Sequence, residues 1–225
     1  MDFAKAFDKV NHSLLVHKLH HYGIRNSTNS WIASFLHGRS QAVVVEGSRS
    51  TNIPVKSGVP QGSVLGPCLF LIYINDLAAR VSSTTRLFAD DTIVYRLIAA
   101  ASDHAALQSD LQRLEEWESQ WDMTFHPDKC SVLTVSKKKK TSAHQYTLHG
   151  HALENVTSAK YLGVTVQADL KWDIHIDTIV KKANQTLGFL RRNLKIGAVH
   201  TKELAYKSLV RPLLEYACTA WDPSS

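Results

Sequence analysis

Phe-Ala-Asp-Asp, residues 88–91, places two adjacent carboxylates between the apolar runs at residues 84–88 and 92–95. This pattern predicts two strands joined by a two-residue acidic turn, with Asp90 and Asp91 at the tip of a hairpin. Like charges about 4 Å apart repel by roughly 4 kcal/mol at an effective dielectric near 20, and an oxygen-seeking divalent cation would neutralise them. The stretch therefore predicts a metal site for phosphate chemistry. The alternative is a solvated surface turn, a place where Asp is common.

Two other segments accompany this hairpin. Near the start of the chain, Asp2 is followed five residues later by an aromatic side chain, Phe7. Residues 57–67 read Ser-Gly-Val-Pro-Gln-Gly-Ser-Val-Leu-Gly-Pro and lead into an apolar run at residues 68–74. In order and spacing, the three segments resemble the reverse transcriptases of non-LTR, LINE-type, jockey-like retrotransposons. The resemblance runs nearly end to end.

The resemblance implies a two-metal catalytic site. It assigns Asp2 and Asp90 to hold two Mg²⁺ ions, with Mn²⁺ as a substitute, and Asp91 matches the second carboxylate of the pair. Such ions activate the primer 3′-hydroxyl and stabilise the leaving pyrophosphate. Phe-His-Pro-Asp-Lys-Cys at residues 125–130 resembles a further family element. Within it, Lys129 matches the lysine that protonates the pyrophosphate, although a lone lysine there is also typical of a solvated surface.

The resemblance also implies a nucleotide site. Phe7 matches the aromatic that lies beneath the incoming sugar and selects deoxynucleotides, although it is equally suited to the core. Gly-Val-Pro-Gln-Gly at residues 58–62 matches the family's second polymerase motif, which approaches the nucleotide and the template. There, glycines leave room for close contact, and proline fixes the entry to the following helix. The implied nucleotide-binding residues are Phe7, Gly58, Pro60, Gln61 and Gly62.

Two features of the C-terminal part imply contact with nucleic acid. Tyr161, Leu162 and Gly163 resemble the hairpin that grips the primer terminus; the alternative is one strand with Gly163 as a bulge. Residues 171–215 hold nine Lys or Arg against four Asp or Glu, in a pattern that predicts helices near 172–193 and 201–216. Basic helices after a palm resemble a thumb, although each cation alone is more typical of a solvated surface. The cations available to duplex phosphates are Lys181, Lys182, Arg191, Arg192, Lys195, Lys202 and Lys207.

Hydrophobic periodicity predicts the remaining elements. Helices are expected near 12–22, 28–37, 63–80 and 103–122, and strands near 41–46, 52–56, 131–136, 145–148 and 160–167. The apolar stripe of the helix at 103–122 is expected in the core. The lysine run at 137–140 is interpreted as a solvated loop tip, with nucleic-acid contact or a localisation signal as the alternative. The fold class is α+β: helices on one face of an antiparallel sheet, as in a polymerase palm, followed by a helical thumb.

The front of the chain differs from the family pattern. Only Met1 precedes Asp2, whereas family members have a strand and a fingers region there. We therefore expect a palm over residues 1–168 without fingers, a thumb-like region over 169–225, and Asp2 on a frayed terminus without ladder hydrogen bonds. The expected function is RNA-directed DNA polymerase, with RNA template, DNA primer and dNTPs as partners. The alternative is a catalytically inactive, nucleic-acid-binding remnant of such an element.

Composition agrees with a folded chain. It has 225 residues, 44% hydrophobic, and a formal net charge of +6. Its longest apolar stretch, residues 68–74, is far short of the roughly 20 residues that a membrane span needs, and no signal peptide is expected. Its three cysteines, Cys68, Cys130 and Cys218, are odd in number and far apart. This spacing predicts a reducing, intracellular location, nuclear or cytoplasmic, rather than secretion.

Overall fold

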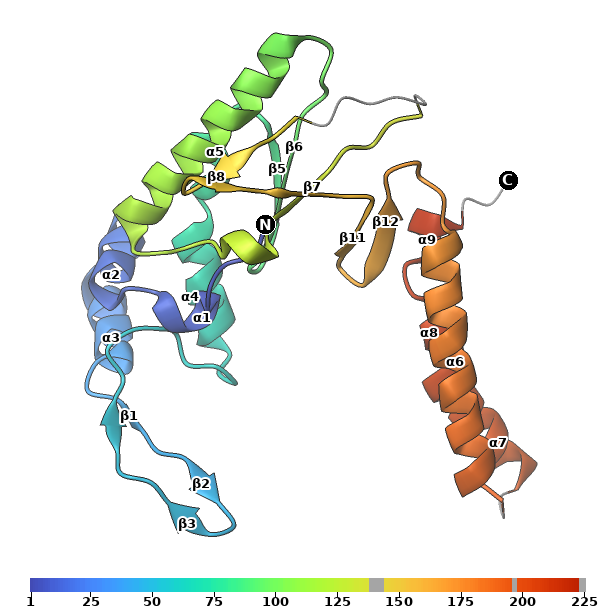
Figure 1. Ribbon diagram of the computed structural model, residues 1–225. Helices are drawn as coiled ribbons and strands as arrows, with labels where there is room; N and C mark the ends of the chain where they lie inside the picture. The colour runs from blue at the N-terminus through green and yellow to red at the C-terminus, as the bar shows by residue number, and fades with distance from the viewer. Residues whose placement is uncertain (138–143, 196–197, 223–225) are drawn as a thin grey trace. The chain divides into compact units, whose positions relative to one another are not determined.

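The computed structural model describes residues 1–137, 144–195 and 198–222 (Figure 1). The chain divides into two compact units, one of residues 1–132 and 144–154 and one of residues 133–143 and 155–225. Helices and strands are mixed, and the strand pairs with a defined register are antiparallel, which confirms the α+β prediction at this level. The described strands form two-stranded pairs rather than one broad sheet.

The helices of the first unit lie close to their predicted positions. Asn11 caps the N-terminus of α2, because its side-chain oxygen accepts hydrogen bonds from the backbone N–H of Ser13 and Leu14. The helix predicted over 63–80 is divided into α4 and a short 3₁₀ turn. The bounds are α1 (Ala6–Lys9), α2 (His12–His21), α3 (Asn26–Leu36), α4 (Leu65–Ile74), η1 (Leu77–Arg80), α5 (Ala101–Trp121) and η2 (Pro127–Lys129).

The strands of the first unit are short apart from one hairpin. The central hairpin pairs β5 (Thr84–Phe88) with β6 (Asp91–Tyr95). Where two strands were expected at 41–46 and 52–56, the chain forms two minimal pairs, and Val44 and Val45 are exposed rather than packed on a core. These pairs are β1 (Ser40–Gln41) with β4 (Ile53–Pro54) and β2 (Val44–Val45) with β3 (Ser48–Arg49), while β8 (Thr147–Leu148) pairs with β9 (His151–Ala152). β7 (Ser131–Leu133) and β10 (Glu154–Val156) lie at the unit boundary.

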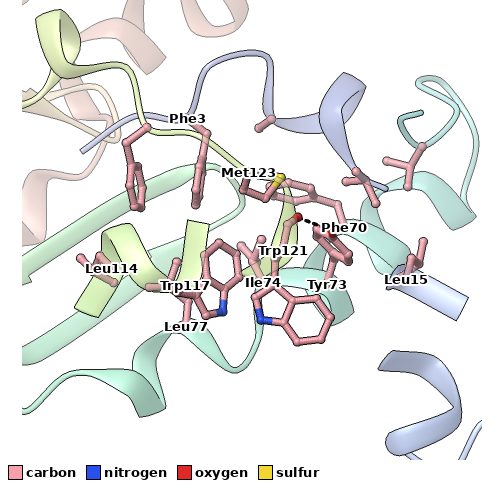
Figure 2. Packing of buried hydrophobic residues seen from close by; sticks show 14 of the residues in the cluster. Phe3, Leu15, Phe70, Tyr73, Ile74, Leu77, Leu114, Trp117, Trp121 and Met123 are labelled. Atoms are coloured by element: carbon pink, nitrogen blue, oxygen red, sulfur yellow. Dashed lines mark hydrogen bonds between the residues drawn. The ribbon is translucent and has the colours of Figure 1, made fainter. Parts of the chain in front are cut away.

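The core of the first unit is built around α4 and α5 (Figure 2). The apolar stripe of α5 is buried at Leu111, Leu114, Trp117 and Trp121, which confirms its prediction as core. The dashed line in Figure 2 marks the hydrogen bond that the Tyr73 hydroxyl donates to the carbonyl of Trp121. These contacts fix α5 against α4.

The second unit combines a hairpin with helices. β11 (Ser158–Tyr161) pairs with β12 (Val164–Gln167), so the strand expected over 160–167 is instead a hairpin that turns at Leu162 and Gly163. The helices are α6 (Asp173–Asn193), α7 (Val199–Ala205), α8 (Arg211–Glu215) and α9 (Cys218–Trp221), with a π-helical turn η3 (Tyr206–Val210) between α7 and α8. That turn interrupts the helix expected over 201–216 just before Pro212, which has no N–H to donate.

The second unit has its own core, and two further findings concern the described residues in general. The small core of the second unit contains Ala183, Leu190 and Val210. Among the described residues, no helix has the length and hydrophobicity needed to cross a bilayer. The lysine run at 137–140 was interpreted as a loop tip, and residues 138–140 of it lie outside the described residues.

Candidate active site

The backbone of Asp2 is held on both sides. Asp2 forms a β-bridge with Asp91, and the flanking Met1 and Thr92 exchange hydrogen bonds, 2.7 Å from the terminal amine to the Thr92 carbonyl and 3.2 Å in return. On its other side, the N–H of His126 donates to the Asp2 carbonyl at 2.9 Å. The expectation of a frayed Asp2 without ladder hydrogen bonds was therefore wrong. These pairings come from residues distant in sequence, which local patterns do not reveal.

Phe3 anchors this segment in the core. It is 2% exposed and stacks on Phe125 with ring centroids 4.1 Å apart. Buried Glu118 supports the partner segment by accepting a hydrogen bond from the N–H of Phe125. Burial raises the pKa of Glu118, and an ion pair with His149, 2.7 Å from Nε2 to Oε2, acts in the opposite direction. The residue next to Asp2 in the chain is therefore firmly packed in the core.

The acidic turn differs by one residue from its prediction. Phe88 pairs with Asp91, so the two turn residues are Ala89 and Asp90, while Asp91 begins β6. Ala89 adopts a left-handed conformation with φ of 50°, which is uncommon for a residue other than glycine. Directly opposed residues on antiparallel strands present their side chains to the same face, so Asp2 and Asp91 are cross-strand neighbours, with Asp90 at the tip.

The side chain of Lys129 lies next to the carboxylate of Asp2. Its Nζ lies 3.3 Å from Oδ2 of Asp2, whose side chain is 33% exposed. The 3₁₀ turn η2 places Lys129 there, with its N–H donating to the His126 carbonyl at 2.9 Å. The structure therefore brings together Asp2, Asp91 and Lys129, with Asp90 on the adjoining turn. In the part of the chain that the structure describes, no group of three or more His, Cys, Asp or Glu side chains is arranged to hold a metal ion.

Gly58 joins the second motif to α1. It has a φ of 90°, and a Cβ on it would lie 2.8 Å from the Cα of Asp8. The N–H of Gly58 donates to the Val10 carbonyl and that of Val59 to the Phe7 carbonyl, each at 2.8 Å. The glycine thus makes room for a neighbouring backbone, whereas the sequence predicted room for substrate. Gly62 differs, because a Cβ there would meet nothing within 4 Å.

Three residues in this region were not identified from the sequence. Nε2 of buried His12 lies 2.7 Å from the Gly58 carbonyl oxygen. Asp8 accepts a hydrogen bond from Nε2 of Gln61 at 3.0 Å. Gly66 has no room for a side chain, since its Cβ would lie 2.3 Å from the Pro60 carbonyl oxygen. None of them carries a local sequence signal beyond its proximity to a motif, since each acts through a contact distant in sequence or within a tight turn.

A pocket of about 610 Å³ opens beside these contacts. Its lining includes Gly58, Pro60 and Gln61 from the second motif. Three cations, Lys5, Arg39 and Lys56, also line it. With Asp8 also in the lining, cations outnumber carboxylates, and such a charge favours an anionic ligand. Phe7 does not line it; this half-buried ring stacks on Phe70 of α4, with centroids 4.4 Å apart.

The predicted residues of the second unit lie on two of its elements. Leu162 and Gly163 form the tip of the β11–β12 hairpin, directly after Tyr161. Of the predicted phosphate contacts, Lys181, Lys182, Arg191 and Arg192 are exposed on α6, and Lys195 is exposed just beyond its end. Residues eleven apart on a helix share a face, so Lys181 and Arg192 point the same way.

Comparison with known proteins identifies the family of the chain. Residues 1–166 match the family described as "Reverse transcriptase (RNA-dependent DNA polymerase)", and the chain therefore belongs to the reverse transcriptase family. Among its relatives are the "RNA-directed DNA polymerase from mobile element jockey" of Drosophila melanogaster, 30% identical over 96% of this chain, and that of Drosophila funebris, 31% identical over 96%. The "Probable RNA-directed DNA polymerase from transposon X-element" of Drosophila melanogaster is 28% identical over 98%. The resemblance to the jockey-like polymerases is confirmed. The chain spans about a quarter, 25%, of the length of each of these relatives.

Proposed function

We propose that this chain forms the catalytic core of an RNA-directed DNA polymerase of a non-LTR retrotransposon. It would add deoxynucleotides to a primer 3′-hydroxyl along an RNA template, inside the cell in the nucleus or cytoplasm. The observation that carries the proposal is the bridge between Asp2 and Asp91, beside the turn that bears Asp90. Membership of the reverse transcriptase family supports it.

We propose that the carboxylates bind magnesium together with the substrate. Mg²⁺ prefers oxygen ligands and is commonly held by one or two carboxylates together with substrate phosphates, so a set completed by substrate is sufficient. Asp2, Asp90 and Asp91 would hold two ions, with Mn²⁺ as a substitute. When bound, the metal ions would activate the primer hydroxyl and neutralise charge on the pyrophosphate. The repulsion between the opposed Asp2 and Asp91 carboxylates would fall at the same time.

Other residues of the first unit would bind and orient the nucleotide. Lys129, 3.3 Å from Asp2, would donate a proton from Nζ to the leaving pyrophosphate. Gln61, held by Asp8, would contact the nucleotide within the motif formed by Gly58, Pro60 and Gly62. Phe7 would support the sugar; its stacking on Phe70 limits how far the ring can move.

The C-terminal part would hold the duplex. We propose a palm over residues 1–168 and a helical thumb over 169–225. Tyr161, Leu162 and Gly163 would contact the primer terminus. The exposed cations of α6, together with Lys195, would contact backbone phosphates, and such contacts weaken as salt rises.

Primer extension tests this function. The chain, with Mg²⁺ and dTTP on a poly(rA)/oligo(dT) template, is compared with Asp90→Ala and with Asp177→Ala. Asp177 is an exposed α6 residue without an ion pair among the described residues. Extension should fall at least about a hundredfold in Asp90→Ala and persist in Asp177→Ala. Equal extension by Asp90→Ala would contradict the site. Template binding without extension by the wild-type chain would support the inactive remnant.

A further inference from the structure

The tip of the β11–β12 hairpin has an unusual conformation. Tyr161 pairs with Val164, which leaves a two-residue loop of Leu162 and Gly163. Both residues have positive φ, 44° at Leu162 and 85° at Gly163. Such loops favour Asn, Asp or Gly at the first position, because a branched side chain is disfavoured there. Leu162 therefore needs contacts outside the hairpin to hold its conformation.

Tyr216, just after α8, provides those contacts. Its hydroxyl donates a hydrogen bond to the Leu162 carbonyl at 3.0 Å. Its ring lies against Gly163, where a Cβ would be only 3.0 Å from Cε1 of the tyrosine. The aromatic ring thus occupies the space that glycine leaves, and the hydroxyl provides a hydrogen-bond partner for the Leu162 carbonyl.

Tyr216 is itself fixed by its neighbours. Its N–H donates to the Pro212 carbonyl at 3.1 Å, and its carbonyl accepts from Nε1 of Trp221 at 2.8 Å. The Trp221 ring meets His175 of α6 edge to face, with centroids 5.4 Å apart. The side chain remains 57% exposed, so the gain from burying the ring does not account for its orientation.

The other end of β12 is attached to the same helices. The N–H of Thr165 donates to Nδ1 of His175 at 3.3 Å, and Oε1 of Gln167 accepts from the N–H of Ile174 at 3.1 Å. The hairpin is therefore joined to α6 along β12, and Tyr216 adds an attachment at its tip. All of these residues belong to the second unit.

We infer that Tyr216 is a positioning residue that joins the Leu162–Gly163 turn to the C-terminal helices, so that the tip and the helices hold the primer strand as one body. This inference rests on the proposed function for its link to the primer. The physical reason is that a terminus misplaced by about 1 Å can lose about a hundredfold in rate. A turn without its own favourable residues would not provide that accuracy alone.

The first test is amide hydrogen exchange at Gly163 and Val164, which needs no catalytic activity. Tyr216→Phe keeps the ring and removes the hydrogen bond, whereas Tyr216→Ala removes both. We expect exchange to rise about two- to tenfold in Tyr216→Phe and further in Tyr216→Ala. Tyr206→Phe is the matched control, because the Tyr206 hydroxyl makes no hydrogen bond among the described residues. Unchanged exchange in both Tyr216 variants would overturn the inference, whether or not the chain polymerises.

The second test is the average product length on the poly(rA)/oligo(dT) template. Tyr216→Phe should shorten the products and leave the KM for dTTP unchanged, since the nucleotide site belongs to other residues. A residue that only stabilised the fold would change both quantities or neither. Raised exchange with unchanged product length would overturn the positioning role. Absence of extension by the wild-type chain would instead count against the proposed function, and the exchange result would still decide whether Tyr216 holds the turn.

Discussion

At the scale of single residues, glycine decides how the second motif meets α1. The Cα of Asp8 would lie 2.8 Å from a Cβ on Gly58, while Gly62 has open space around it. Both residues have positive φ. The two positions therefore separate the cost of a left-handed backbone from the cost of a steric clash.

We predict that Gly58→Ala destabilises the chain by about 2–4 kcal/mol, because the conformational cost and the clash add. Gly62→Ala should lose only about 1–2 kcal/mol, the conformational part. Urea unfolding of both variants measures the difference. Equal losses would show that the contact with Asp8 is not a constraint on the fold.

The hydrogen bond from Gln61 to Asp8 leads to a second prediction. Asp8→Ala should raise the KM for dTTP about fivefold. The variant removes the hydrogen bond that orients the Gln61 side chain, and one such bond contributes about 1 kcal/mol. Asp8→Asn retains an acceptor oxygen and should remain close to wild type. Steady-state extension measures both variants. A KM unchanged in Asp8→Ala would mean that Gln61 does not bind the nucleotide.

Residues in local motifs could be predicted from the sequence, whereas residues that depend on distant partners could not. The proposed metal ligands Asp2, Asp90 and Asp91 could be predicted because they lie in local motifs. Asp8 and Tyr216 were not, because their roles depend on partners that the fold brings from elsewhere. For Gly58 the sequence indicated that a side chain would be excluded, but not that the backbone of Asp8 is the neighbour that excludes it.

At the scale of elements, α5 holds the base of the β5–β6 hairpin. Fully buried Asp110 accepts hydrogen bonds from the N–H groups of Ser82 and Ser83, at 2.9 and 2.8 Å, just before β5 begins. Arg96, just after β6, donates to the Ser82 hydroxyl at 3.1 Å. The same Nη1 of Arg96 lies 3.9 Å from Oδ2 of Asp110, so both ends of the hairpin contact one carboxylate.

We predict that Asp110 makes the first unit acid-sensitive. Burial alone would raise the pKa of Asp110, but hydrogen bonds from Ser83 and Ser82 outweigh it and hold the pKa below its ordinary 3.8. A carboxyl with a depressed folded pKa contributes stability that is complete above its unfolded pKa and is lost as pH falls towards the folded pKa. Stability should therefore decline below about pH 4 in the wild type and less steeply in Asp110→Asn. Unfolding at several pH values measures this, and parallel pH curves would contradict it.

Helices were easier to predict than strands. The periodic stripes of α5 and α6 extend over many residues, so each helix lies close to its expected bounds. The acidic turn was displaced by one residue, because a positive φ at Ala89 has no sequence signal. The π-helical turn at η3 was missed for a similar reason, since a helical pattern does not distinguish the two hydrogen-bond registers.

At the scale of the whole molecule, the chain has two units with separate cores, which would carry different parts of the proposed function. The first contains the carboxylates and the basic pocket, and the second contains the hairpin tip and the exposed cations of α6. The net charge of +6 suits an anionic partner such as nucleic acid. The central claim is that carboxylates far apart in the sequence act on the same metal ions.

Iron-mediated cleavage tests that claim most directly. Fe²⁺ replaces Mg²⁺ in a complex of the chain with template, a dideoxy-terminated primer and dTTP, and ascorbate and peroxide generate radicals that cut the backbone beside the metal. Mass spectrometry should find cuts near both Asp2 and Asp90, and both sets should disappear in Asp90→Ala while they persist in Asp177→Ala. Cuts near only one of these segments, or cuts that survive Asp90→Ala, would contradict a shared metal site.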